Sequence, residues 1–150
     1  MILVLGLGNP VLSDDGVGIH VINALRERKI PGVDARECFS DFDLMEAINR
    51  KYSRIIIVDA VKTGNEPGTV YYASIENFPV RFSTHNIDLN LLKIENLPEI
   101  TILAIEVEDT ETISERCTQA VERAISEILN IIENLSFETY HQTKQKVKKH

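Results

Sequence analysis

The sequence predicts an α/β protein: a three-layer α/β/α sandwich around a five-stranded, mostly parallel sheet with one antiparallel strand. The first observation is that short apolar runs alternate with amphipathic helical patterns along the chain. The second is that these runs are rich in β-branched residues, which is typical of strands buried on both faces. The 150 residues are enough for one hydrophobic core.

The first half of the chain contains three predicted strands and two predicted helices. In order they are a strand at 2–5, a helix from Asp14 or Asp15 to about Arg28, a strand at 33–38, a helix at 41–49 and a strand at 54–59. The first helix has its apolar residues on one stripe at 3.6-residue spacing. The strand at 54–59 is a continuous β-branched run, so we expect it at the centre of the sheet.

The second half supplies the remaining strands and helices. They are a strand at 69–74, a loop at 76–84, a helix at 86–95, a strand at 100–105 and a helix at 111–134. The turn at 62–68 is too short for a parallel crossover, so the strand after it should be antiparallel or lie at an edge. The last helix has a long apolar stripe made of Ile113, Cys117, Val121, Ala124, Ile128 and Leu135. We expect one domain at 1–135, followed by a disordered basic tail at 136–150.

Composition excludes several classes of protein. The chain has 23 acidic and 16 basic residues and a net charge of −7, which argues against a general nucleic-acid binder. No apolar run approaches the roughly 20 residues of a membrane-spanning helix, and the start does not read as a signal peptide. Two cysteines are too few for a disulfide framework. We therefore expect a cytoplasmic protein, and a monomer because one core accounts for most of the apolar stripes.

The first strand runs into a glycine-rich turn that invites comparison with dinucleotide-binding proteins. Their fingerprint requires a third glycine where this chain has Val11. The helix start that would attract phosphate also begins with Asp14 and Asp15, whose charges would repel it. Glu37 could mimic the ribose-binding acid of that fold, so nucleotide binding stays as a minor alternative.

Two adjacent aspartates at a helix start suggest two different roles. Ser13 or Asp14 can cap the helix, and negative charge suits the helix dipole there. One residue is enough for a cap. Asp15 is then free to face the crevice at the sheet edge, where Gly16 and Gly18 would keep the wall low.

Asp59 and His85 complete a candidate metal site with Asp15. Asp59 ends the most buried strand, and ligands of open α/β sheets bind at the carboxyl ends of strands. His85 precedes a predicted helix, where a neutral, metal-ligating imidazole is tolerated. Two carboxylates and an imidazole suit a borderline first-row metal such as nickel, and three ligands leave positions open for substrate. The alternatives are a turn-forming aspartate and a surface-loop histidine.

Three sequence blocks resemble the nickel-iron hydrogenase maturation proteases. They are Gly6-x-Gly8-Asn9-x-x-x-x-Asp14-Asp15-Gly16-x-Gly18, then Ile56-Ile57-Val58-Asp59-Ala60-Val61 with Pro67-Gly68-Thr69, and finally His85 after Ser83-Thr84. The blocks occur in the family's order and spacing, and the resemblance covers about residues 1–135. It implies a phosphorylase/hydrolase-like fold.

The resemblance also implies an activity and a set of site residues. Asp15, Asp59 and His85 match the family's nickel ligands, although glutamate is frequent at the first position. The implied enzyme is an aspartic-type endopeptidase, with Asp15 and Asp59 as its catalytic carboxylates. It would remove the C-terminal extension of a hydrogenase large-subunit precursor after nickel insertion, so the nickel is carried by the substrate and need not be bound in the free enzyme.

The family's substrate-contacting loop maps onto Glu37, Cys38, Phe39 and Ser40. Here glutamate replaces aspartate, serine replaces threonine and the glycine is lost, so the substrate preference can differ from that of other members. Cys38 is a remote candidate for a nucleophile, because no base is fixed beside it.

Two further alternatives remain open from the sequence. One is a noncatalytic module that binds nickel or the precursor through the same residues. The other is a peptidyl-tRNA hydrolase, whose opening resembles Gly6-Leu7-Gly8-Asn9-Pro10. The Thr-Arg-His-Asn segment of that family does not follow here, and a net charge of −7 fits tRNA poorly.

Overall fold

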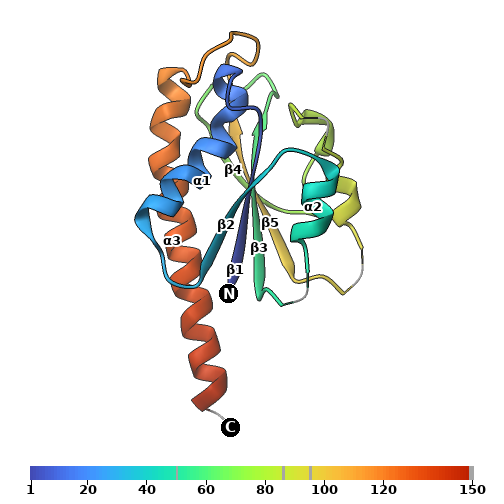
Figure 1. Cartoon of the computed structure of the whole chain (residues 1–150), viewed down its shortest axis with the longest axis vertical. Helices are drawn as coiled ribbons and strands as arrows, with labels where there is room; N and C mark the ends of the chain where they lie inside the picture. The colour runs from blue at the N-terminus through green and yellow to red at the C-terminus, as the bar shows by residue number, and fades with distance from the viewer. Residues whose placement is uncertain (50, 86, 95, 149–150) are drawn as a thin grey trace.

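The protein folds around a five-stranded sheet (Figure 1). The structure is a computed structural model that describes residues 1–49, 51–85, 87–94 and 96–148. Side chains are described through residue 139 and at His141. The strands are β1 (Ile2–Leu7), β2 (Val33–Cys38), β3 (Arg54–Val61), β4 (Val70–Ser74) and β5 (Glu99–Glu106). Their order across the sheet is β2-β1-β3-β5-β4, and every pairing is parallel except that of β4 with β5. The predicted α/β class, with five strands and one antiparallel neighbour, is confirmed.

The two strands that position the site, β1 and β3, are neighbours in the middle of the sheet. All of β1 is buried, as is all of β3 except its first residue. Their register pairs Ile2 with Arg54 and Gly6 with Val58. Because the strands are parallel, the segments that follow their carboxyl ends meet at one edge of the sheet.

Both faces of the sheet are covered, which gives the three predicted layers (Figure 1). The helices α1 (Val17–Arg28) and α3 (Gln119–Lys148) pack on one face. On the other face lie α2 (Asp41–Ala47) and residues of the single-turn helix η3 (Leu89–Leu92). Burial on both faces explains why the central strands are almost entirely apolar.

The start of the first helix differs from the prediction. A 3₁₀ turn, η1 (Ser13–Gly16), precedes α1, which begins at Val17, and no side chain caps either element. The expected capping by Ser13 or Asp14 is therefore wrong. The Asp14 carboxylate is engaged elsewhere, with backbone N–H groups of residues 108, 109 and 118.

The helix predicted at 86–95 is also wrong. Its described residues, 87–94, contain only the 3₁₀ turn η3, in which the Asp88 side chain accepts a hydrogen bond from the Asn90 N–H. Leu89 and Leu92 are both buried, and residues three apart lie on the same side of a 3₁₀ turn. The expected helix ends at residues 86 and 95 lie outside the described residues.

The last helix begins at Gln119 instead of residue 111. The Asp109 side chain accepts hydrogen bonds from the N–H groups of Glu111 and Thr112, which bends the chain into a turn. Ile113, expected on the buried stripe, is 85% exposed.

At its other end α3 continues to Lys148, into the segment expected to be a disordered tail. Ser136 is still buried at 8% exposure, so the helix packs at least one residue beyond the expected boundary. The division of the chain at residue 135 stays a prediction. Within the described ranges, no helix combines the length and apolarity that a bilayer crossing requires.

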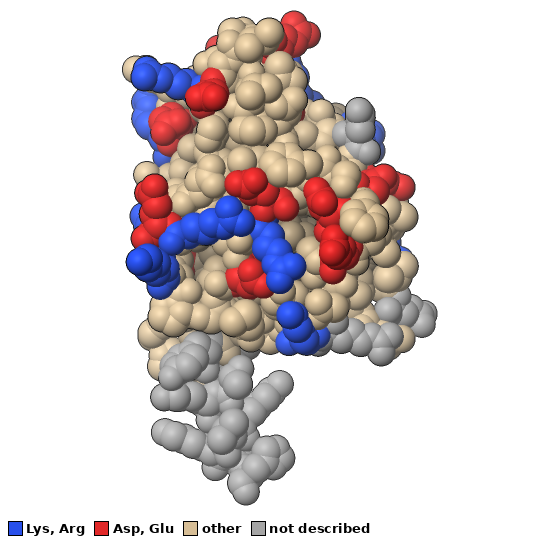
Figure 2. Space-filling model, viewed as in Figure 1, with Lys and Arg blue, Asp and Glu red and all other residues tan. Residues whose placement is uncertain are grey.

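The edge strand β2 carries paired charges. Arg36 binds Asp34 at 2.9 Å and Arg26 lies 3.4 Å from Glu37. Acidic and basic side chains accordingly lie close together on the face shown in Figure 2. Charged side chains on an edge strand discourage pairing with another chain, so β2 is protected as an edge.

Candidate active site

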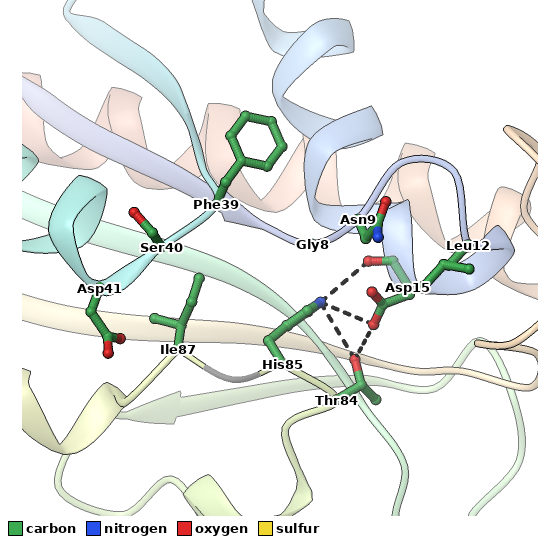
Figure 3. A pocket seen from close by; sticks show the side chains of 10 residues that line it. All are labelled: Gly8, Asn9, Leu12, Asp15, Phe39, Ser40, Asp41, Thr84, His85 and Ile87. Atoms are coloured by element: carbon green, nitrogen blue, oxygen red, sulfur yellow. Dashed lines mark hydrogen bonds and ion pairs between the residues drawn. The ribbon is translucent and has the colours of Figure 1, made fainter.

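A cavity of about 510 Å³ opens at the carboxyl ends of β1 and β3 (Figure 3). Three separate parts of the chain line it: Gly8, Asn9, Leu12 and Asp15; Phe39, Ser40 and Asp41; and Thr84, His85 and Ile87. The cavity lies where the crevice of an open α/β sheet is expected.

Asp15 reaches the cavity because the chain after β1 folds back closely on itself. The Asn9 N–H donates to the Asp15 carbonyl at 3.2 Å. Gly8 has a φ of +150°, and a Cβ there would lie 2.3 Å from the Asp15 carbonyl oxygen, so only glycine allows this approach. The Asp15 residue is 6% exposed, and its Oδ1 accepts a hydrogen bond from the Thr84 hydroxyl at 2.5 Å.

Asp59 lies in β3 and is fully buried. Its Oδ1 lies 2.6 Å from His85 Nδ1 and accepts a second hydrogen bond from the Ala60 N–H at 2.9 Å. The other oxygen, Oδ2, is buried and has no hydrogen-bond partner among the described residues. A buried carboxylate oxygen without a partner is unusual, and it leaves Asp59 with unused capacity to bind a donor or a cation.

His85 is held between the two aspartates. The segment before it runs along the end of β3, because the Thr84 N–H donates to the Ala60 carbonyl at 3.1 Å. From there the ring places Nδ1 at Asp59 and Nε2 at 3.1 Å from Asp15 Oδ1. The side chains of positions 15, 59 and 85, far apart in the sequence, therefore form one connected group.

This arrangement governs the charge of the group. Burial by itself would lower the pKa of His85, but hydrogen bonds to Asp15 and Asp59 and their negative charges raise it to about 10. Burial would raise the pKa of Asp15, but its bonds to His85 and Thr84 and the charge of the ring lower it. At neutral pH the free protein thus holds a protonated His85 ring beside an ionised Asp15.

The donor atoms of this group are of the right kind for a metal ion, but they are not arranged around one. Two carboxylates and one imidazole are suitable donors for a first-row cation, and Asp59 Oδ2 is free to bind. In the part of the chain that the structure describes, however, no three His, Cys, Asp or Glu side chains surround a common ion position. His85 would first have to lose a proton, because only a neutral ring nitrogen can bind a metal.

The predicted substrate loop is only partly at the cavity. Phe39 and Ser40 line it, and the Ser40 hydroxyl also accepts the Asp43 N–H as the N-cap of α2. Glu37 points elsewhere and pairs with Arg26, while Cys38 is fully buried. Burial raises the pKa of the Cys38 thiol to about 11, which makes it a poor nucleophile.

Thr84 and Asp41 are cavity residues that the sequence reasoning did not single out. Thr84 directly precedes His85 in the sequence, but a hydroxyl residue beside a histidine is too common to indicate a site. Asp41 is the first residue of α2 and directly follows Ser40, so it extends the predicted substrate loop by one residue.

Fold and site together define an α/β protein with a carboxylate–imidazole group in a crevice at its strand ends. The sequence pattern of the hydrogenase maturation protease family (HycI) matches residues 40–135. A Methanocaldococcus jannaschii protein assigned as a hydrogenase maturation protease is 30% identical over 148 residues, covering 87% of this chain and 96% of its own length. The chain belongs to the hydrogenase maturation protease family.

Solved structures agree with this membership. The hydrogenase maturating endopeptidase HybD from Escherichia coli superposes with a TM-score of 0.74 at 26% identity, over 92% of this chain and 93% of that one. HybD from Thermococcus kodakarensis, a nickel-iron hydrogenase maturation protease, has the same fold, with a TM-score of 0.74 over 90% of this chain and 98% of its own.

Proposed function

We propose that this protein is an endopeptidase that removes the C-terminal extension of a nickel-iron hydrogenase large-subunit precursor after nickel insertion. In this proposal Asp15, Asp59 and His85 recognise the nickel that the precursor carries. The observation that supports it most is that these three side chains, from three separate segments, form one connected group, of which Asp15 and His85 line the cavity.

The three residues would have different roles. The Asp59 carboxylate holds His85 Nδ1 and thereby fixes the direction of Nε2, as carboxylates commonly do for metal-binding histidines. Neutral Nε2 and the Asp15 carboxylate would be the donors to the precursor's nickel, and the ring proton would be released to water. Nickel stays part of the substrate, so the free enzyme needs none.

Asp15 is the better placed of the two aspartates to act on water. It lines the cavity, whereas Asp59 is fully buried behind the His85 ring. A carboxylate with a lowered pKa is ionised at neutral pH and can accept a proton from an attacking water. We therefore assign the base to Asp15 and the orientation of the ring to Asp59, within an aspartic-type mechanism.

Substitution of His85 and Asp15 tests the proposal directly. His85→Ala and Asp15→Asn should each lower the cleavage rate of nickel-loaded precursor by at least about a hundredfold, because the first removes a proposed nickel donor and the second removes the proposed base. Cleavage would be measured by the mass of the products, and folding by circular dichroism. His141→Ala, at an exposed histidine of α3, is the matched control and should cleave normally.

Full processing by both site variants would contradict the proposal. Wild-type protein that binds loaded precursor without releasing a shortened product would instead indicate the noncatalytic module. The cytoplasmic location and the monomeric state expected from the sequence stay predictions.

A further inference from the structure

The Asp14 side chain is buried and has partners that differ from those of its neighbour Asp15. It is fully buried, and neutral donors of one segment, residues 107–118, bind its carboxylate. They are the Glu108 and Asp109 N–H groups at 3.0 Å from Oδ2, the Thr118 N–H at 2.6 Å from Oδ1, and the Thr118 hydroxyl at 2.8 Å and 3.1 Å. Such multiple bonding offsets the cost of burying the charge.

The same 107–118 segment also fixes the backbone around Asp14. The Asp14 N–H donates to the Asp109 carbonyl at 2.9 Å, and the Ser13 N–H donates to the Ser114 carbonyl at 2.8 Å. Ser13 adopts a left-handed φ of +46°, which a serine holds only where surrounding contacts impose it. The turn before Asp15 is therefore shaped by a distant part of the chain.

Two adjacent residues thus have separate partners. Asp14 binds the 107–118 segment, and Asp15 binds Thr84 and His85 at the cavity. Asp14 does not cap its own turn, so local helix stability does not explain its burial. The bonds of Asp14 instead fix the backbone position of the next residue, Asp15.

We propose that Asp14 is a positioning residue, which anchors η1 to the 107–118 segment and thereby sets the distance between the Asp15 carboxylate and His85 Nε2. This inference rests on the proposed function, because that distance matters only if Asp15 and His85 act together. It also implies an asymmetry: Asp59 lies in β3, which β1 and β5 hold on both sides, so the contact of Asp59 with Nδ1 does not depend on Asp14.

Thr118 offers a mild test, because its hydroxyl can be removed while its N–H remains. Thr118→Val should lower kcat for precursor cleavage about tenfold with little change in KM, since a small displacement of a catalytic group costs rate more than binding. Thr118→Ser keeps the hydroxyl and should restore the rate. Thr63→Val is the matched control: it removes another threonine hydroxyl bonded to a buried carboxylate, that of Glu106, outside the cavity.

Nitrogen NMR of the His85 ring supplies a readout independent of activity. Thr118→Val should shift the Nε2 resonance, which reports Asp15, and leave the Nδ1 resonance, which reports Asp59. Asp14→Asn should shift Nε2 further, because both Asp14 oxygens accept from backbone N–H groups and an amide NH₂ would face a donor in either orientation.

The outcomes separate the two proposals. Folded Thr118→Val and Asp14→Asn variants with wild-type kcat and an unmoved Nε2 resonance would overturn the positioning role. Equal shifts of both ring nitrogens, or the same loss of kcat in Thr63→Val, would also overturn it by indicating general destabilisation. Wild-type protein that cleaves no precursor would contradict the proposed function, while the ring resonances would still decide the role of Asp14.

Discussion

Gly18 shows how closely the backbone packs beneath the site. A Cβ at this position would lie 2.2 Å from the Leu7 carbonyl oxygen and 2.8 Å from that of Val58, so α1 begins in direct contact with the ends of β1 and β3. The sequence suggested that glycines here keep the crevice wall low. The structure gives a different reason, because Gly18 allows helix and strands to touch.

Gly18→Ala should therefore be strongly destabilising. The neighbours of the new methyl group are backbone atoms, which cannot move aside as a flexible side chain would, so we expect a loss of about 1–3 kcal/mol in the free energy of unfolding. Urea denaturation followed by circular dichroism measures this. A variant as stable as wild type would mean that α1 shifts without cost.

Glu106 predicts a pH dependence of stability. It is 1% exposed and accepts hydrogen bonds from the Thr63 N–H at 2.8 Å and the Tyr71 hydroxyl at 2.9 Å. Burial would raise the pKa of its carboxyl group, but bonds to Thr63 and Tyr71 lower it below the ordinary 4.5. The stability that Glu106 contributes is thus present above about pH 4.5 and is lost as the pH falls through the lowered pKa.

Glu106→Gln should reduce the loss of folding stability at acidic pH. The variant should have a lower Tm at pH 7, because the amide replaces a charged acceptor, and the difference from wild type should shrink below pH 4.5. Thermal unfolding between pH 7 and pH 3 measures both effects. A constant difference across that range would show that Glu106 titrates alike in the folded and unfolded chains.

At the scale of elements, the end of β2 delivers an exposed aromatic residue to the cavity. Phe39 lines the cavity and is 54% exposed, so it adds little to the core. If the precursor lies across this cavity, Phe39 contacts it. Phe39→Ser should then raise KM several-fold at nearly constant kcat, the pattern of a contact made equally in the ground and transition states.

Phe137→Ser provides the matched control for this measurement. Phe137 is 64% exposed on α3 and lines a different cavity, which also includes Met1 and Pro31. Its replacement should leave KM unchanged. Equal effects of the two substitutions would point to solubility rather than to substrate contact.

The strands could be predicted from sequence, and the helix ends could not. Continuous β-branched runs identify buried strands whatever their neighbours, so β3 and β5 differ from expectation only at their ends. The late start of α3 follows from the turn at Asp109. The 3₁₀ turn before α1 is bonded through Asp14 to residues 108–118, which no local pattern reveals. The segment around Leu89 has helical composition, yet it forms a 3₁₀ turn that buries two leucines against the sheet.

At the scale of the whole molecule, the site follows from the strand order. Because β1 and β3 are adjacent and parallel, Asp15 and Asp59 lie at the same edge of the sheet. The sequence predicts this meeting only on the condition that the two strands are neighbours. The insertion of the His85 ring between the two aspartates could not be predicted. It depends on the path of residues 80–85 along β3, which the sequence shows only as a loop.

The long span of the Asp14 contacts has a consequence during synthesis. Its partners lie 94 to 104 positions further along the chain, so they leave the ribosome long after the glycine-rich turn has emerged. A nascent polypeptide that ends before Thr118 can already hold Asp15, Asp59 and His85, yet it lacks the residues that fix the first of them. The turn that carries Asp15 would thus reach its final position only after Thr118 has left the ribosome.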